Sequence, residues 1–385
     1  MENLSEVIKI LEGALQHNIR KAADYAGLLA DKLEQQGEIR QANIVRQKLA
    51  RAPQETFSPT SIANTLPVDS ESQLHTVDEE RPRASDIELA LPETVEARLS
   101  EFIKSVQAAD MLAAAGVCQP SRLLLYGPPG CGKTQAARMI AARLNLPLLT
   151  VRCDTLVSSL LGQTSRNLRR VFEHAADRPC ILFLDEFDAL AKSRADEREI
   201  GELQRVVIAL LQNVDALSPD TILIAATNHE ELLDRAVWRR FAWHVPLAFP
   251  DMYLREHIWA LKLGDRMPTG ISYGELAELS DGLSGAAIEH VAHDAIRSSV
   301  LRGDAQVDDI DLLRRLGLTI AMTKGLRLDS RDREIAFLRD WAPRHLVLRK
   351  LANYYAVSVR QISNATKGEA HGGKRRKSNP IRSES

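Results

Sequence analysis

The segment GPPGCGKT at residues 127–134 constrains the fold of this chain more than any other. The apolar run RLLLY (122–126) precedes it, and the helix-like run QAARMIAARL (135–144) follows it. Glycines let a backbone wrap closely around a phosphate chain, and the N–H groups of the loop and of the following helix attract negative charge. Strand, loop, Lys-Thr pair and helix in this order predict a nucleotide phosphate loop rather than a simple glycine-rich turn.

The composition bounds the class of protein. The chain has 385 residues, 44% apolar and 26% charged, as is typical of soluble globular proteins. Its formal net charge of −2 means that nucleic-acid binding would need a local basic patch. No apolar stretch reaches the roughly 18 residues of a membrane span, and the start MENLSEVIKILEG is acidic and amphipathic, unlike a signal peptide. The lack of an apolar span predicts no membrane partner. The four cysteines form no C-x-x-C pair, so we expect neither a zinc site nor a disulfide framework, and their use suits a cytoplasmic protein.

Apolar runs alternate with helix-like patterns from residue 86 to about residue 250. Buried parallel strands are continuously apolar, and the runs ILFLD and ILIAAT fit that rule. The alternation predicts an α/β fold with a doubly wound, five-stranded parallel sheet. The strands are expected at Arg122–Tyr126, Leu148–Arg152, Cys180–Asp185, Thr221–Thr227 and Ala242–Leu247.

The N-terminal part has a different pattern. An apolar stripe at helical spacing is followed by a second helical run, which predicts a helical hairpin or three short helices up to residue 50. Such a module is either an adaptor that docks a client or a helix pair that dimerises or packs through its apolar stripe. Residues 51–85 are rich in Pro, Ser, Thr and acids and are expected to be a flexible linker. The stripe consists of Leu4, Val7, Ile8, Leu11 and Leu15.

Polar side chains follow the predicted strands. In CILFLDEFD, Asp185 can hold the Mg²⁺ shell, and Glu186 can polarise a water that attacks the γ-phosphorus. In TILIAATN, Asn228 could hydrogen-bond the γ-phosphate or that water, although an Asn at a strand end is often only a turn residue. In LDRAVWRRF, Arg239 and Arg240 form either a solvated edge or guanidinium contacts to the phosphate of a neighbouring subunit.

The segments GPPGCGKT, ILFLDEFD, ATN, WRRF and GLSGAAIEH, in that order, resemble the AAA clade of the AAA+ ATPases over about residues 86–300. This resemblance implies a five-stranded P-loop NTPase domain with a helical lid. It also implies ATP and Mg²⁺ as cofactors. The family binds ATP between the subunits of a homo-oligomeric ring, usually a hexamer.

The resemblance also implies roles for single residues. Asp185 and Glu186 match Walker B, with Glu186 as catalytic base, and Asn228 matches sensor 1. Arg239 and Arg240 match the arginine-finger region, where the family often has two arginines three positions apart. Here they are adjacent, and both are expected to serve as the finger, Arg240 slightly more than Arg239. Thr134 and Asp185 are the expected Mg²⁺ ligands. The expected nucleotide-binding residues are Gly127, Pro128, Pro129, Gly130, Cys131, Gly132, Lys133, Thr134, Gln135, Asp185, Gly285 and Ala286.

Two further positions leave alternatives open. The family's central-pore loop usually carries an aromatic residue, whereas SSLLG (158–162) offers Leu160. Leu160 either grips an extended polypeptide or packs against the ring or a helix start. Cys131 is either a redox sensor, if loop N–H groups lower the pKa of its thiol, or a small residue tolerated in the loop.

The C-terminal segment LRKLANYYAVSVRQISNAT (348–366) has the apolar spacing of a helix–turn–helix, with Ala356–Ser358 as its turn and Ser358 as a cap. The alternative is a pair of helices that packs against the ring or an adaptor. If the segment binds DNA, the expected contacts come from Arg360, Gln361 and Asn364 in the groove and from Arg344, Arg349, Lys350 and the tail GGKRRKSNPIR at phosphates.

The expected function is that of a Mg²⁺-dependent ATP hydrolase that forms a ring and remodels or unfolds a protein client. The alternative is a DNA-binding regulatory ATPase switched by ATP. No protease signature is present, so degradation of a client would need a separate partner protein such as a protease. The expected parts are an N-terminal adaptor (1–50), a linker (51–85), the ATPase domain (86–250), a helical lid (251–325), a C-terminal helical block (326–367) and a disordered basic tail (368–385).

Overall fold

The structure is a computed structural model that describes residues 3–16, 18–50, 77–117, 119–153, 161–188 and 200–372, without side-chain detail at 161–167, 200–206 and 367–372. The chain divides into two compact units. Unit 1 holds residues 1–89 and 93–248, and unit 2 holds residues 90–92 and 249–385. The boundaries of the six parts expected from the sequence stay predictions.

Unit 1 is built on a six-stranded sheet in the order β1-β3-β4-β5-β2-β6. The five predicted strands are present, and their ends lie within one residue of the expected ones. These five strands pair with one another in parallel. The α/β fold with a parallel sheet is therefore confirmed. The strands are β1 (Asp78–Glu80), β2 (Arg122–Tyr126), β3 (Leu148–Arg152), β4 (Ile181–Asp185), β5 (Ile222–Thr227) and β6 (Trp243–Pro246).

Strand β1 is an addition to the predicted sheet. It lies within the segment expected to be a linker, and it pairs antiparallel with β3 at the sheet edge. Its sequence, Asp-Glu-Glu, has no strand signal, because acidic residues are depleted in strands. An edge strand has only one hydrogen-bonded neighbour. Backbone pairing with β3 is what holds β1 in the strand conformation.

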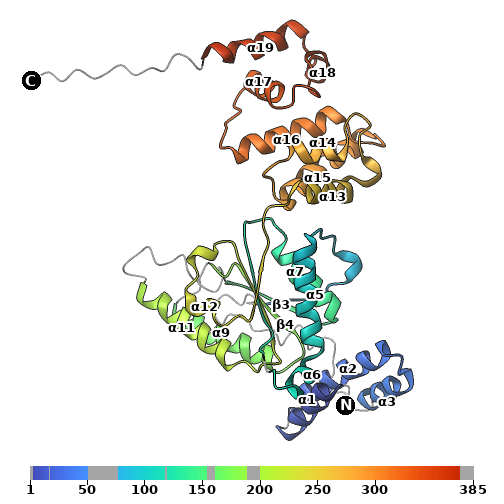
Figure 1. The fold of residues 1–385 in the computed structure, drawn as a ribbon, viewed down its shortest axis with the longest axis vertical. Coiled ribbons are helices and arrows are strands. Elements are labelled where there is room, and N and C mark those ends of the chain that lie inside the picture. The colour runs from blue at the N-terminus through green and yellow to red at the C-terminus, as the bar shows by residue number, and fades with distance from the viewer. Residues whose placement is uncertain are drawn as a thin grey trace, which may run out of the picture. The chain divides into compact units, whose positions relative to one another are not determined.

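Helices cover both faces of this sheet, α5 and α7 on one side and α9, α11 and α12 on the other (Figure 1). The central strands β2, β4 and β5 are buried along nearly their whole length, as expected for strands covered on both faces. The covering helices, with the short helices of unit 1, are η2 (Ala84–Asp86), α5 (Glu93–Gln107), α6 (Ala109–Ala114), α7 (Lys133–Leu144), α9 (Leu161–Ala176), α11 (Ile200–Ala216), η4 (Glu230–Leu232) and α12 (Arg235–Trp238).

Three N-terminal helices also belong to unit 1: α1 (Leu4–Leu15), α2 (Ile19–Gln35) and α3 (Ile39–Ala50). The face of α1 that is buried is its polar one, with Glu6 and Lys9 only 6% and 8% exposed. Lys9 forms an ion pair of 3.4 Å with Asp220, and the Ser5 N–H donates to Asp110 at 2.8 Å. The apolar stripe of α1 is therefore left exposed by the residues that the structure describes.

Unit 2 combines the expected lid with the C-terminal helical block. Both parts share one hydrophobic cluster, in which Trp259, Leu312, Leu338, Leu351 and Ile362 are all buried. The helices are α13 (Met252–Leu263), η5 (Gly264–Arg266), α14 (Tyr273–Leu279), α15 (Gly285–Arg302), α16 (Asp309–Thr323), α17 (Arg331–Trp341), α18 (Leu348–Tyr354) and α19 (Val359–Gly372).

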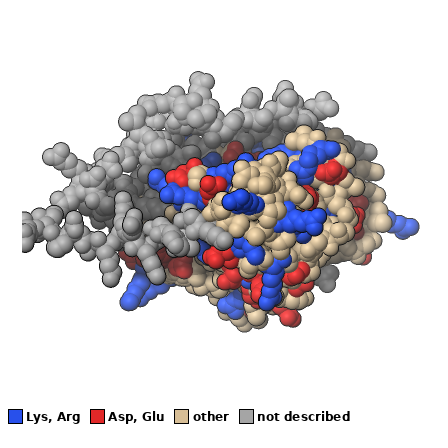
Figure 2. All heavy atoms as spheres, turned by 90° about the horizontal axis from the view of Figure 1, so that it is seen from above, with Lys and Arg blue, Asp and Glu red and all other residues tan. Residues whose placement is uncertain are grey.

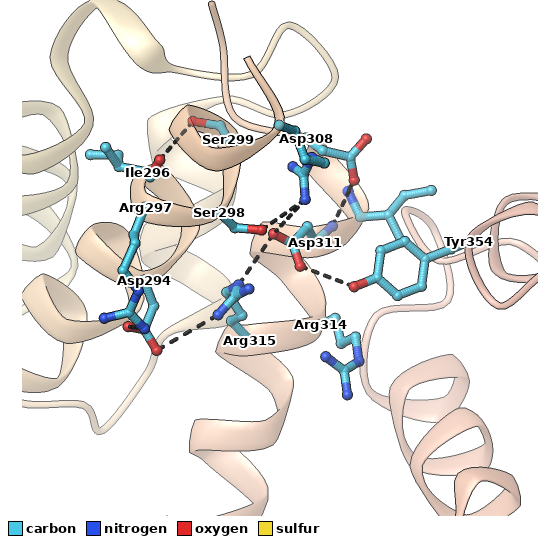
Figure 3. Close-up of polar contacts among 12 residues, drawn as sticks. Asp294, Ile296, Arg297, Ser298, Ser299, Asp308, Asp311, Arg314, Arg315 and Tyr354 are labelled. Atoms are coloured by element: carbon cyan, nitrogen blue, oxygen red, sulfur yellow. Dashed lines mark hydrogen bonds and ion pairs between the residues drawn. The ribbon is translucent and has the colours of Figure 1, made fainter. Parts of the chain in front are cut away.

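A buried carboxylate ties α16 to the C-terminal block (Figure 3). Asp311 is 2% exposed and accepts hydrogen bonds from the Tyr354 hydroxyl at 3.0 Å and from Arg315 at 3.2 Å. Burial alone would raise the pKa of Asp311, but these hydrogen bonds and the nearby guanidinium charge hold it below its usual value. Tyr354 belongs to α18, so the position of that helix on the lid is specified by a polar contact as well as by the shared core.

Candidate active site

The polar side chains that follow β2, β4 and β5 meet at one edge of the sheet. These three strands are neighbours, and their parallel register pairs Tyr126 with Thr227 and Leu184 with Ala225. The carboxyl ends of adjacent parallel strands lie together, so the phosphate loop after β2, the acidic pair at the end of β4 and Asn228 after β5 lie at the same edge. The sequence predicted each of these positions separately, and the sheet order brings them together.

The phosphate loop relies on glycine at its first position. Gly127 has φ 133°, and a Cβ atom built there would lie 2.2 Å from the Leu247 carbonyl oxygen, just after β6. Gly130 and Gly132 also have positive φ. The loop therefore passes so close to the neighbouring backbone that a side chain at Gly127 cannot be accommodated.

Replacing Gly127 with Ala should destabilise unit 1 by about 3 kcal/mol and abolish nucleotide binding, because both the backbone conformation and the packing exclude a Cβ. Thermal unfolding and equilibrium binding of a fluorescent ATP analogue measure the two effects. Gly27→Ala in α2 is the matched control, since nothing lies within 4 Å of its Cβ and Ala favours a helix interior. A Gly127→Ala protein as stable as Gly27→Ala would contradict the close approach.

Lys133 begins α7 and is 7% exposed. Its ammonium donates to the carbonyl oxygens of Gly127 at 2.7 Å and Pro128 at 2.8 Å. Burial lowers the pKa of Lys133, although the nearby carboxylates oppose that shift. The cation is thus held within the loop, beside the N–H groups of the α7 N-terminus, where a phosphate chain would find its strongest positive potential.

Thr134 and Asp185 come together as the predicted metal ligands. The Thr134 hydroxyl donates to the Asp185 carboxylate at 3.0 Å, although 51 residues separate them in the chain. A hydroxyl and a carboxylate oxygen are ligands that Mg²⁺ accepts, with water and phosphate oxygens completing its octahedron. The donor set therefore fits Mg²⁺, and these two residues would hold it.

Glu186 directly follows β4 and has an unusual backbone. Its φ is 52°, in the left-handed region that non-glycine residues rarely adopt, and its N–H donates to the Asp185 carboxylate at 2.9 Å. Such strain costs roughly 1–3 kcal/mol and is retained mainly at functional sites. A strained residue directly after Asp185 suits a site in which one carboxylate serves the metal and the other a reacting water.

Asp188 is a site residue that the sequence reasoning missed. It is 2% exposed, and its carboxylate accepts from the Asn228 N–H at 3.2 Å and the Thr227 hydroxyl at 3.4 Å. These bonds tie the segment after β4 to the segment after β5 and so position Asn228. The only signal in the sequence was a third acidic residue in LDEFD, which has no meaning until the partner strand is known.

The two arginines of the WRRF segment differ sharply. Arg240 makes a bidentate pair with Asp215 of α11, at 2.9 and 2.8 Å, and also donates to the Ala236 carbonyl at 2.7 Å. Arg239 is exposed and has no ion pair with any residue that the structure describes. Among the described residues, Arg240 is therefore held by contacts of its own chain and Arg239 is not, and which of the two serves as the arginine finger stays a prediction.

The same residues match a known family. The model of the ATPase family associated with various cellular activities (AAA) matches residues 123–248. An uncharacterized AAA family ATPase, y4kL, from Sinorhizobium fredii is 37% identical over 276 residues, which cover 71% of this chain and 83% of that protein. The chain belongs to the AAA family of ATPases.

Other relatives are matched over smaller shares of their own length. The ATP-dependent zinc metalloprotease FtsH 1 of Methylacidiphilum infernorum is 30% identical over 286 residues, 71% of this chain and 44% of that protein. A proteasome-activating nucleotidase from Pyrococcus furiosus is 31% identical over 235 residues, 59% of each chain. The chain thus spans less than two thirds of these two proteins. As a member of the family, this AAA ATPase is an ATP hydrolase, and the family in general uses ATP with Mg²⁺.

The remaining predicted positions of this AAA ATPase stand as follows. Burial raises the pKa of the Cys131 thiol despite the nearby Lys133 charge, which argues against the redox-sensor alternative. Gln135 is exposed and accepts from Arg138 at 3.4 Å. Gly285 and Ala286 are the first residues of α15 in unit 2, and Leu160 lies outside the described residues.

Within the described part of the chain, no helix is long and apolar enough to cross a membrane.

Proposed function

We propose that this AAA ATPase assembles into a homo-oligomeric ring, with a hexamer as the expected form, and uses Mg²⁺-dependent ATP hydrolysis to remodel or unfold a protein client. The observation that carries the proposal is the pairing of Thr134 with Asp185, with Glu186 next in the chain. That arrangement would hold a metal and offer a base to a water at the same edge of the sheet. A separate protease as partner remains part of the proposal.

The exposed Arg239 supports a ring. A hydrolytic site of this kind gains most from a guanidinium that reaches the γ-phosphate in the transition state. In its own chain Arg239 follows α12 and forms no ion pair with an acidic residue that the structure describes, whereas its neighbour Arg240 is already paired. An arginine supplied to the next subunit would couple hydrolysis to assembly.

The apolar stripe of α1 supports a protein client. Its five side chains carry no charge, and the opposite face of the helix is held to the rest of unit 1 by the Lys9–Asp220 ion pair and the Ser5–Asp110 hydrogen bond. Contiguous exposed apolar surface of this kind usually marks a site for another protein. The exposed fractions are 39% for Leu4, 36% for Val7, 44% for Ile8, 56% for Leu11 and 79% for Leu15.

The test compares ATP turnover with and without a reduced, carboxymethylated polypeptide. In the double variant Ile8→Asp, Leu11→Asp, the polypeptide concentration that gives half-maximal stimulation should rise about tenfold, because a charge in the stripe removes apolar contacts. Leu301→Asp is the matched control, since Leu301 is 80% exposed on α15 and belongs to no stripe. Stimulation by duplex DNA but by no polypeptide would contradict a protein client and favour the DNA-regulated alternative.

A further inference from the structure

Helices α17, α18 and α19 end the described chain as a three-helix arrangement with a sharp, specified turn. Between α18 and α19, Ala356 adopts φ 52°, and the Ser358 hydroxyl accepts from the Gln361 N–H at 3.3 Å. The Gln361 side chain in turn accepts from the Ser358 N–H at 2.9 Å. This reciprocal capping box sets where α19 begins and at what angle the chain enters it. The turn and cap expected from the sequence are therefore present.

One side of this arrangement packs into a hydrophobic core that it shares with the lid. Leu351, Ala352 and Ile362 are buried in the core that α17–α19 share with α16, so the block does not stand apart from unit 2. The other side of α19 is open: Val359 is 46% exposed, and Arg360 and Asn364 are also exposed. Arg360 and Asn364 are four residues apart and therefore project from the same face of the helix.

The charge of the chain is unevenly distributed. Residues 326–385 carry 14 Lys and Arg against 6 Asp and Glu, whereas the whole chain carries 50 against 52. Arg344, Arg349 and Arg360 are exposed and have no ion pair among the residues that the structure describes. Lys350, expected to contact phosphate, instead pairs with Asp309 at 2.7 Å. On the part of the molecule that Figure 2 shows in colour, Lys and Arg lie among acidic and uncharged side chains.

We propose that α17–α19 bind duplex DNA, with the first two turns of α19 in the major groove. Arg360 is suited to the O6 and N7 acceptors of guanine, Asn364 to the N6 and N7 groups of adenine, and Val359 to a thymine methyl group. Gln361, expected to read a base, is occupied in the capping box and has a structural role instead. Arg344 and Arg349, before and within α18, contact phosphates.

The surroundings of α19 leave room for this contact. An open groove of about 560 Å³ runs between α17 and α19, and Asn364 lies on its wall. Asp332 also lines this groove, together with Arg331 and Arg333, so the charge along it is mixed. Double-stranded RNA is excluded as the main ligand, because its deep, narrow major groove does not admit a helix.

The test is fluorescence anisotropy of the full chain with labelled duplexes of about 24 base pairs, first enriched for binding from a random pool, at about 50 and 200 mM salt. Binding should weaken steeply with salt. Arg360→Ala and Asn364→Ala should each lower affinity for the enriched duplex about tenfold, and affinity for an unrelated duplex much less. Arg297→Ala on α15, where the arginine is 69% exposed, is the matched control and should change neither affinity.

Arg360→Lys distinguishes the loss of a base contact from a folding defect. It keeps the charge but loses the bidentate contact, and it should therefore lower only the affinity for the enriched duplex. Every variant retains the basic residues after 372, so nonspecific attraction is constant across the series. Failure of the pool to enrich, equal binding of single strands, or an equal loss of affinity for all duplexes would overturn the proposal. None of these outcomes bears on polypeptide-stimulated ATP turnover, so the proposed remodelling function is tested independently.

Discussion

Replacing Glu186 with Gln should lower the steady-state rate of ATP hydrolysis by about 10²–10⁴-fold while ATP still binds. Gln has nearly the same shape but cannot accept a proton from the attacking water. Lys133, Thr134 and Asp185, which would hold the nucleotide and Mg²⁺, are unchanged by this substitution. Phosphate release measures turnover, and equilibrium binding of labelled ATP measures affinity.

Glu231→Gln provides the control, because Glu231 is an exposed carboxylate in the short helix η4 after Asn228 and its loss removes the same charge. That variant should turn over ATP at nearly the wild-type rate. A Glu186→Gln protein with wild-type turnover would mean that another group activates the water. The same variant, held in its ATP-bound state, should retain the client in a pull-down; recovery of abundant DNA with no specific protein would contradict the remodelling proposal.

Replacing Arg239 with Ala should lower turnover by about 10³-fold, because the transition-state charge on the γ-phosphate loses a guanidinium from the next subunit. Arg240→Ala is the matched comparison. Its bidentate partner Asp215 is half exposed, so losing the pair should cost only about 1 kcal/mol of stability and little of the rate. Turnover and thermal unfolding of the two variants separate these effects.

A mixing experiment decides whether Arg239 acts between subunits. An Arg239→Ala subunit retains Glu186, and a Glu186→Gln subunit retains Arg239. In a randomly mixed ring made from equal amounts of both, about a quarter of the sites combine the two intact residues, so roughly that share of wild-type turnover should return. An inactive mixture would show that both residues serve the site of one chain, and would remove the main support for the ring.

Much of unit 1 could be predicted from the sequence because its signals are local. Continuous apolar runs identified β2 to β6, and the phosphate loop identified where the sheet's crevice must lie. Strand β1 escaped prediction because Asp-Glu-Glu carries no hydrophobic pattern, and its strand conformation comes from pairing with β3. The direction in which the α1 stripe faces was also not predicted, because periodicity shows that a helix is amphipathic but not which of its faces packs against the rest of the protein.

What the sequence by itself determined is the chemistry available: a phosphate loop, two successive carboxylates, an amide after a strand and a pair of arginines. Which of these groups can act was decided only by tertiary contacts between distant segments. Asp215 pairs with Arg240 and leaves Arg239 available, Asp188 positions Asn228, and Gln361 is taken by the cap of α19. The physical reason is that a hydrogen bond or ion pair depends on distances of about 3 Å, and only the folded chain sets such distances between residues far apart in sequence.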